Sequence, residues 1–379
     1  MRRICMLAVI AYGLVLAGGL VARGQGEAPP PAPPEGAQAR PTEMDDKTRD
    51  AIDKGMKFLA SIQDRSTGGF GDQNKLVATS LAGMAFLSGG NLPGRGLYGK
   101  NVEDAVNFIL TNAVMPTGYL QFQASNMYTH GFTALFLAEA YGTLPPYTKL
   151  EPRVRKALGK AIELLEKCQN QEGGWWYEPV KNSGGQGADI SVTVCETNAL
   201  RAARNCGIAV DKRVIEKALK CVKAAANQDG GFSYRVYPGR GGDGQSAFAR
   251  SAGAVCILEA LGAYKETVTK AGLKYLVDNG LPKQGGVQLQ FAGSYLYYSS
   301  YYASQAMFMA GKSYWAKWWP FIRDVLVGQQ QPDGSWPPGE GQNKAYSAGI
   351  SLIVLQMPFR YLPIYQEGVE NEETEQPAQ

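Results

Sequence analysis

The sequence has few of the residues that mark several common classes of protein. Only 19% of its 379 residues are charged, and its six cysteines include no C-x-x-C pair. It contains neither an Arg-rich helix nor an aromatic RNA-binding motif, so nucleic acid is not expected as a partner. In contrast, 45% of the residues are apolar. That share is enough to bury a large core, and it excludes collagen, a coiled coil and a disulfide-held miniprotein.

Both ends of the chain differ in composition from its middle. Arg2 and Arg3 precede an apolar stretch over residues 4–22. This pattern predicts a signal peptide over residues 1–24 and a periplasmic or secreted protein. An uncleaved N-terminal membrane anchor is the alternative, and a membrane is expected as a partner only in that case. Residues 25–43 repeat Pro and Ala and predict an extended linker, and residues 366–379, with five Glu and no basic residue, predict an acidic disordered tail.

The folded domain is therefore expected over residues 44–365, with 34 Lys and Arg against 26 Asp and Glu. Five cysteines remain once the leader is removed, and all of them lie in helical patterns. We expect small buried apolar side chains, while one disulfide bond in an oxidising compartment is the open alternative. These residues are Cys168, Cys195, Cys206, Cys221 and Cys256.

A Gly-Gly-aromatic marker, or a close variant of it, recurs along this domain. The marker positions, spaced 49, 56, 57, 55 and 49 residues apart, are Phe70, Tyr119, Trp175, Phe232, Val287 and Trp336. In five copies a glutamine stands shortly upstream, namely Gln63, Gln171, Gln228, Gln284 and Gln331. Amphipathic runs such as residues 48–62 and 211–226 precede the markers. Runs that are apolar nearly all round, such as residues 79–87 and 192–203, follow them.

Six units of half-exposed helix, Gly-rich turn and buried helix predict a closed ring of two layers. The outer helices would face water and the inner ones would line the middle. An open solenoid is the competing arrangement, but it needs polar capping repeats, and the first and sixth inner runs are as apolar as the others. Glycine suits the turns because a chain that reverses between layers needs positive φ and close approach.

Three of the markers carry a family resemblance. QNQEGGWW at residues 169–176, NQDGGFSY at 227–234 and QQPDGSW at 330–336 resemble the QW-type repeats of squalene cyclases and of protein prenyltransferase β subunits. Segments at residues 127–142, 189–203 and 301–320 are similar to secreted bacterial proteins that carry this prenyltransferase/squalene-oxidase repeat. The resemblance implies an all-α fold, the (α/α)6 toroid with six outer–inner helix hairpins, which agrees with the repeat count.

The known chemistry of these two enzyme classes does not transfer to this sequence. The resemblance implies a D-x-D-D acid for a squalene cyclase, and no such motif occurs. A prenyltransferase β subunit implies zinc ligands in the order Asp, Cys, His, whereas the one histidine here, His130, lies upstream of every cysteine of the expected domain. No metal and no cofactor are therefore expected, and whether the protein is an enzyme stays open.

Parallel inner helices would gather their N-termini at one mouth of the ring, where their dipoles favour anions. His130 precedes an inner run, where a neutral imidazole could shuttle protons or could hydrogen-bond a neighbouring hairpin. Asp189 also precedes an inner run, so that helix capping competes with a catalytic role. Glu196 and Arg201 lie within that run, where a charge must be paired or face a cavity. With Tyr298, the residues His130, Asp189 and Glu196 are the catalytic candidates.

A cluster of tyrosines supplies the candidate binding residues. Tyr298, Tyr302 and Gln305 follow one another at intervals of four and three, so they project from one face of a helix. If that face points inward, it offers rings and polar groups to a ligand; packing in the core is the alternative. Tyr302 and Gln305, with Arg250 at the rim, are therefore the predicted ligand-binding residues.

Three function classes follow from the sequence. The first is an exported repeat protein that binds an extended or apolar ligand, or a protein partner, in its central cavity without cyclase or zinc chemistry. The second is an isoprenoid enzyme of the cyclase or transferase type. The third is a carbohydrate-active toroid, a lyase or a hydrolase, which needs ionisable side chains across the mouth.

Overall fold

The computed structural model describes residues 43–365 except 146, 283–294 and 340–341. The chain divides into two units, residues 1–39 and 40–379, and every described residue belongs to the second. The predicted leader, nearly all of the predicted linker, the predicted acidic tail and the fifth marker at residues 284–287 lie outside the described residues. Their boundaries stay predictions.

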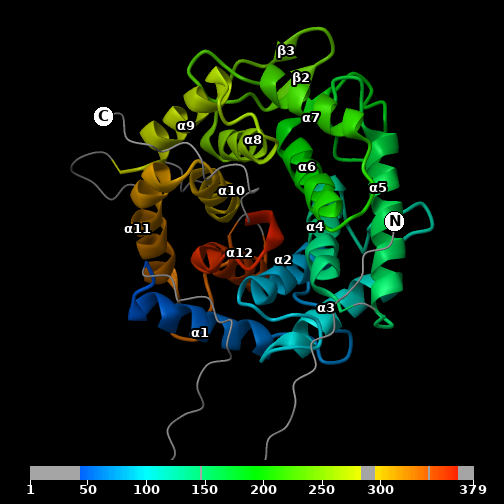
Figure 1. The fold of residues 1–379 in the computed structure, drawn as a ribbon, viewed down its shortest axis with the longest axis vertical. Helices are drawn as coiled ribbons and strands as arrows, with labels where there is room; N and C mark the ends of the chain where they lie inside the picture. The colour runs from blue at the N-terminus through cyan, green and yellow to red at the C-terminus, as the bar shows by residue number, and fades with distance from the viewer. Residues whose placement is uncertain (1–42, 146, 283–294, 340–341, 366–379) are drawn as a thin grey trace, which may run out of the picture. The chain divides into compact units, whose positions relative to one another are not determined.

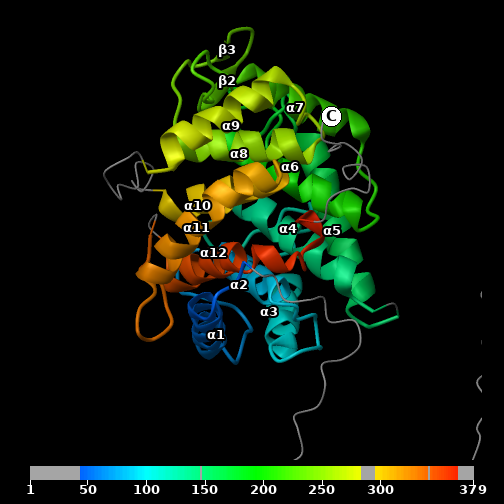
Figure 2. The same cartoon turned by 60° about the vertical axis from the view of Figure 1, so that its left-hand side comes forward.

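The described residues form twelve α-helices that alternate between an outer and an inner layer. The outer helices are α1 (Asp46–Ser61), α3 (Gly99–Asn112), α5 (Glu151–Cys168), α7 (Lys212–Ala224), α9 (Thr267–Gly280) and α11 (Lys312–Gln329). The inner helices are α2 (Lys75–Ser88), α4 (Met127–Thr143), α6 (Ile190–Asn205), α8 (Phe248–Ala260), α10 (Leu296–Met309) and α12 (Lys344–Leu355). Figure 1 shows the inner layer surrounded by the outer one, and Figure 2, turned by 60°, shows outer helix α9 alongside inner helix α8.

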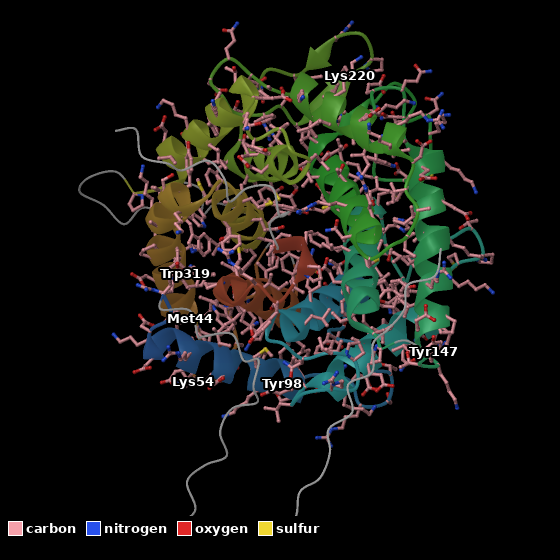
Figure 3. All side chains as sticks on the ribbon, in the orientation of Figure 1. Met44, Lys54, Tyr98, Tyr147, Lys220 and Trp319 are labelled. Carbon is pink, nitrogen blue, oxygen red and sulfur yellow. The ribbon has the colours of Figure 1, made fainter. Side chains whose placement is uncertain are left out.

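The two layers differ in burial as the sequence predicts. Outer helices are amphipathic, and Lys54 of α1 and Lys220 of α7 project from their exposed faces (Figure 3). Inner helices are buried on all sides: every residue from position 76 to 88 in α2 and from 345 to 355 in α12 is buried. The N-cap of helix α1 is Asp45, whose carboxylate accepts a hydrogen bond from the Thr48 amide at 2.8 Å.

The ring closes on itself. Inner helix α12 packs against α2, and outer helix α1 packs against α11 and α12. Gln330, at the end of α11, donates its amide hydrogens to the carbonyl oxygens of Ala51 in α1 at 2.8 Å and of Gly334 at 3.1 Å. The predicted (α/α)6 toroid is therefore confirmed, and an open solenoid is excluded.

The same amide clamp recurs in other repeats. Gln63 donates to Gly68 and to Asn101 of the next outer helix, and Gln169 donates to Gly173 and to Val214 of α7, all at 2.8 to 3.0 Å. The predicted marker glutamines Gln171 and Gln331 do not fill this position: Gln171 is exposed and Gln331 donates only to the nearby Gln329 carbonyl. In these two repeats the clamp is formed by the neighbouring Gln169 and Gln330, which directly follow α5 and α11.

Glycine is required where the turn meets the next outer helix. Gly173 has φ 91°, and a Cβ at this position would lie 2.3 Å from the carbonyl oxygen of Lys217 in α7. The indole of Trp175 donates to the Leu165 carbonyl of its own outer helix at 2.9 Å. This turn therefore joins two neighbouring hairpins through glycine and anchors to its own hairpin through the aromatic residue.

A small antiparallel sheet sits beside the turns that enter α6 and α8. It consists of β1 (Ala188–Asp189), β2 (Arg235–Tyr237) and β3 (Gly241–Gly242), in the order β1-β2-β3. Asp189 is paired with Arg235 across β1 and β2. The sheet thus fixes the residue that precedes α6 against the residues that follow the fourth marker.

Two short 3-10 helices, η1 (Met357–Phe359) and η2 (Pro363–Tyr365), follow α12, and η2 packs against α4 and α6. The five cysteines of the described residues are free, and four of them are buried, as expected for small apolar side chains. None of the described helices combines the length and the hydrophobicity that a bilayer crossing requires.

Candidate functional site

Asp189 is the centre of a polar cluster at the end of the ring where the inner helices begin. Its Oδ1 accepts a hydrogen bond from the Val192 amide at 3.0 Å, so that it caps α6 as the sequence suggested. Its Oδ2 accepts a hydrogen bond from the Tyr177 hydroxyl at 2.9 Å. The residue is fully buried, and this burial raises the pKa of its carboxyl, against the opposing effect of the hydrogen bonds from Val192, Tyr234 and Tyr177.

Tyr177 and Tyr234 form a matched pair over this carboxylate. Each stands two residues after the aromatic of its marker, Trp175 or Phe232, and their hydroxyls hydrogen-bond to each other. Both rings are only partly buried. Burial raises the pKa of both phenols, and the Asp189 charge adds to the shift, so that they stay protonated donors at neutral pH.

Two more tyrosines complete the cluster from inner helices. Tyr128 at the start of α4 lies 5.8 Å from Tyr177 and 6.5 Å from Tyr298 of α10, measured between ring centroids. Tyr298 donates its hydroxyl to the Ser191 carbonyl at 3.4 Å. We call Tyr128, Tyr177, Asp189, Tyr234 and Tyr298 the mouth cluster.

A guanidinium and an indole lie beside the mouth cluster. The Arg235 guanidinium stacks 4.6 Å from the ring centroid of Trp176 and 5.2 Å from that of Tyr234. Arg250, a predicted binding residue, donates to the carbonyls of Phe232 and Gln245 and lies 5.8 Å from Tyr234. Trp176 and Arg235 are both partly exposed. The mouth therefore presents aromatic faces, hydroxyls and a cation to solvent above a buried carboxylate.

The middle of the ring is filled by aromatic side chains. Helix α10 stands opposite α4 in the inner layer. Tyr301 of α10 packs against Phe132 of α4 at 5.9 Å, and Tyr302 reaches the thiol of Cys195 in α6 at 3.2 Å. Tyr301 and Tyr302 are fully buried. Of the two alternatives that the sequence left open for this face of α10, the structure shows packing in the core: the tyrosines span the centre of the ring.

Gln305 belongs to the same core. It is 1% exposed, donates to the Tyr301 carbonyl at 3.2 Å and lies 3.8 Å from the Cys256 thiol. Neither Tyr302 nor Gln305 reaches the surface of the mouth. Of the predicted site residues, the structure brings together Asp189, Tyr298 and Arg250.

His130 lies inside the wall rather than at the rim. Its Nδ1 accepts a hydrogen bond from the Leu120 amide at 3.1 Å, and its other nitrogen faces the Ala161 carbonyl of α5. In other repeats a hydroxyl takes the place of this imidazole. The hydrogen bonds from the backbone amides of Phe70, Trp175 and Phe232 are accepted there by the hydroxyls of Thr79, Thr193 and Ser251, respectively. Burial lowers the pKa of His130 to about 4, so its imidazole is neutral at pH 7.

Glu196 also lies in the wall, between α6 and α4. Its carboxylate meets the backbone side of Gly131, where an added Cβ would lie 3.0 Å from Oε2. The side chain is fully buried, and neither oxygen has a hydrogen-bond partner among the described residues. Burial raises the pKa of this carboxyl well above its ordinary value. Neither side chain lies at the rim of the mouth, and the catalytic roles of His130 and Glu196 stay predictions.

Sequence reasoning missed Tyr128, Trp176, Tyr177, Tyr234 and Arg235. The signal for Tyr177 and Tyr234 was present, because both follow a marker aromatic at the same spacing. Arg235 carried no signal, since its stacking on Trp176 depends on the pairing of β1 with β2. The described residues contain no group of three or more His, Cys, Asp or Glu side chains placed to hold a metal ion.

A closed ring of outer and inner helices with its polar cluster at the inner N-terminal mouth defines an α/α toroid. Residues 147–310 match the family model of the squalene-hopene cyclase C-terminal domain. The chain thus has a squalene cyclase-like toroid fold, as its markers indicated. No curated protein matches the sequence.

Solved structures of two kinds share this fold. A variant of the type II terpene cyclase MstE from Scytonema, in complex with merosterolic acid A, is 13% identical with a TM-score of 0.57, over 82% of this chain and 97% of that chain. An inactive variant of the alpha-1,6-mannanase GH76A of Salegentibacter sp. HEL1_6, in complex with alpha-1,6-mannotetrose, is 10% identical with a TM-score of 0.60, over 82% of this chain and 98% of that chain. At these identities the likeness shows the fold alone.

Proposed function

We propose that this protein binds an extended, hydroxyl-bearing ligand, a glycan chain, across the mouth of the ring. One observation carries the proposal: partly exposed Trp176 and Arg235 stack beside Tyr177 and Tyr234, whose hydroxyls meet over the buried Asp189. Aromatic faces stack on the apolar faces of sugar rings, and hydroxyl, carboxylate and guanidinium groups exchange hydrogen bonds with sugar hydroxyls. The mouth cluster together with the adjacent Trp176 and Arg235 offers all of these within one surface.

The filled centre argues against an isoprenoid ligand. A polyprenyl chain needs a deep apolar cavity to leave water, and Tyr301, Tyr302 and Phe132 occupy that place here. The mannanase that shares the fold binds a mannose oligomer, which supports a glycan in a toroid of this build. The match of residues 147–310 to a cyclase family supports the isoprenoid alternative, so the experiment must separate the two.

The proposal is limited to binding. Glycoside hydrolysis in most families uses two carboxyl groups on either side of the bond, and the mouth cluster supplies Asp189 alone.

The leader predicted over residues 1–24 would bring this surface into contact with extracellular glycans. Mass spectrometry of the mature N-terminus tests the cleaved leader: a chain that begins near residue 25 supports a cleaved signal peptide and export, and an intact residue 1 contradicts cleavage and leaves the membrane-anchored alternative.

Affinity electrophoresis through gels that contain single polysaccharides tests the ligand class. We expect at least one polysaccharide, with alpha-1,6-mannan first in the panel, to retard the folded protein against a non-binding reference protein. In parallel, the protein is incubated with a fluorescent geranylgeranyl lipid. Saturable lipid binding without retardation by any polysaccharide in the panel would assign the protein to the isoprenoid class and contradict the proposal.

A further inference from the structure

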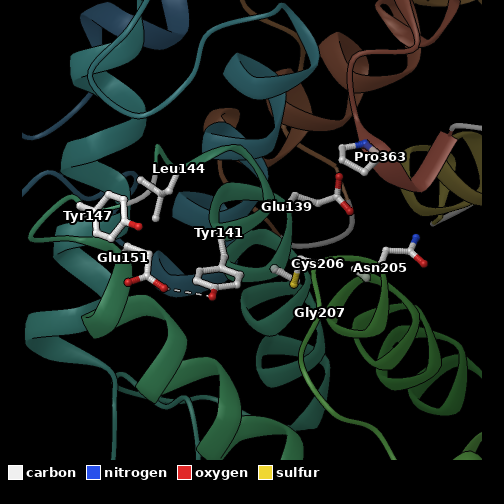
Figure 4. A pocket seen from close by; sticks show the side chains of 12 residues that line it. Glu139, Tyr141, Leu144, Tyr147, Glu151, Asn205, Cys206, Gly207 and Pro363 are labelled. Carbon is white, nitrogen blue, oxygen red and sulfur yellow. Dashed lines mark hydrogen bonds between the residues drawn. The ribbon is translucent and has the colours of Figure 1, made fainter. Parts of the chain in front are cut away.

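A pocket lies at the end of the ring opposite to the mouth. It has a volume of about 690 Å³ and opens between the C-terminal ends of α4 and α6, beside the start of α5 and under η2 (Figure 4). Its polar lining residues are Glu139, Tyr141, Glu151, Asn205 and Cys206. This pocket shares no residue with the mouth cluster, and the proposed glycan binding does not use it.

The described lining of this pocket is rich in hydrogen-bond acceptors and includes no Lys or Arg. Glu139 is only 2% exposed, and its Oε2 has no hydrogen-bond partner among the described residues. Glu151 accepts a hydrogen bond from the Tyr141 hydroxyl at 3.1 Å. The C-terminal ends of α4 and α6 add their partial negative charges, because the last carbonyls of a helix have no partner within it.

The cations near the pocket leave this negative character in place. Arg201 of α6 faces Glu139 and donates to the Ile364 carbonyl at 3.0 Å, while the Ile364 amide hydrogen-bonds to the Glu139 carboxyl. Arg155 of α5 lies near Tyr141. Neither arginine lines the pocket. A buried carboxylate oxygen without a donor is costly, and a ligand that brings a donor would satisfy it.

Tyr147 adds an aromatic ring at the rim of the pocket. Its side chain is 99% exposed, and its backbone is in the left-handed region with φ 68°, which is unusual for a tyrosine. An exposed ring beside carboxylates is a suitable face for a cation. Figure 4 shows Tyr147 on the same side as Glu151, across the pocket from Glu139.

We propose that this pocket binds a small organic cation with a primary ammonium group, which donates to Glu139 while its carbon chain lies against Tyr141 and Tyr147. The ammonium supplies three donors, and the pocket supplies the acceptors of Glu139, Glu151 and Asn205. Burial raises the pKa of the empty Glu139 carboxyl to about 8, so the bound cation displaces a proton at pH 7.

Isothermal titration with putrescine, a linear diamine, tests the proposal on the full folded chain. We expect one saturable site for putrescine and none for 1-butanol, which lacks the charge. Glu139→Gln should weaken binding at least about tenfold. The matched control is Glu259→Gln, because Glu259 precedes Ala-x-Gly at the end of α8 as Glu139 does at the end of α4, yet does not line the pocket. Its affinity should equal that of the parent.

Proton release gives a second readout. At pH 7 the buffer takes up the proton that binding releases, so the binding heat of the parent should differ between phosphate and Tris, which differ in ionisation enthalpy. The affinity of the parent for putrescine should also rise as the pH approaches 8. Glu139→Gln should show neither effect. Tyr147→Ala keeps the test available if Glu139→Gln fails to fold, since this exposed side chain contributes nothing to the core. Absence of saturable binding below about 10 mM, or equal affinity of parent and Glu139→Gln, would overturn the proposal.

Discussion

Gln330 donates its side-chain amide to the carbonyl oxygen of Ala51 at 2.8 Å, and this bond joins the last outer helix to the first. The same amide also satisfies the Gly334 carbonyl. Gln330→Ala removes both donors and leaves two carbonyls at the seam without them, so we expect a loss of about 1 to 3 kcal/mol in the free energy of unfolding. Urea denaturation measures this loss.

Gln331→Ala is the matched control for the seam. Gln331 is exposed and donates only to the Gln329 carbonyl, so its removal should change stability by less than about 0.5 kcal/mol. Equal losses for the two variants would mean that the amide clamp does not hold the ring closed.

Replacement of glycine by alanine should have opposite effects on stability at two positions. Gly173→Ala places a Cβ 2.3 Å from the Lys217 carbonyl at positive φ, and we expect a loss of roughly 2 kcal/mol or more. Gly159→Ala lies inside α5 with no atom within 4 Å of the added Cβ, and should stabilise the protein by about 0.5 to 1 kcal/mol. Urea denaturation of both variants tests this, and a Gly173→Ala variant as stable as its parent would contradict the turn geometry.

His130 should make the protein less stable in mild acid. Its pKa is lowered from 6.5 to about 4 by burial, so between these values the unfolded chain binds the proton that the folded chain refuses. Stability is then fully present above pH 6.5 and falls by up to about 1.4 kcal/mol per unit as the pH drops towards 4. His130→Asn keeps an acceptor for the Leu120 amide without a titrating ring, and its denaturation midpoint should lose this part of the pH dependence.

Glu139 should make the protein less stable as the pH rises, which is the opposite of the effect of His130. Burial raises the pKa of its carboxyl from 4.5 to about 8, so the folded chain holds a proton that the unfolded chain releases. Stability should fall as the pH rises from 4.5 towards 8 and level off above it. Glu139→Gln removes that slope and should therefore gain on the parent as the pH rises. Denaturation curves at pH 5, 7 and 9 measure the difference, and parallel profiles for the two proteins would contradict the burial of this group.

The repeats and the layers were accessible from sequence because they depend on periodicity. Residues 79–87 and 192–203 were apolar nearly all round and lie within α2 and α6, whereas residues 48–62 and 211–226 alternated at helical spacing and cover α1 and α7. Ring closure followed from the apolar first and sixth inner runs, since neither offers a polar end to a solenoid. These are properties that hydrophobic pattern alone decides.

The interior could not be predicted in the same way. Tyr298 and Tyr302 were expected on one face of a helix, and their rings do lie 4.7 Å apart. Whether that face meets a cavity depends on the width of the ring, which small residues of the inner helices set: an added Cβ on Gly83 of α2 would lie 2.2 Å from Phe136 of α4. Such close approach lets the α10 tyrosines reach across to α4 and α6. Spacing along the chain carries no information on that distance.

Replacement of Trp176 tests the central claim most directly. The affinity of the parent for the polysaccharide that retards it most, measured by affinity electrophoresis at a series of concentrations, is compared with that of Trp176→Ala and of Tyr264→Ala. Tyr264 is the control because it is 39% exposed and follows the C-terminal end of α8, whereas the mouth lies where the inner helices begin. Loss of stacking should weaken binding at least about tenfold in Trp176→Ala and leave Tyr264→Ala unchanged. Equal affinity of the parent and Trp176→Ala would contradict a glycan site at the mouth.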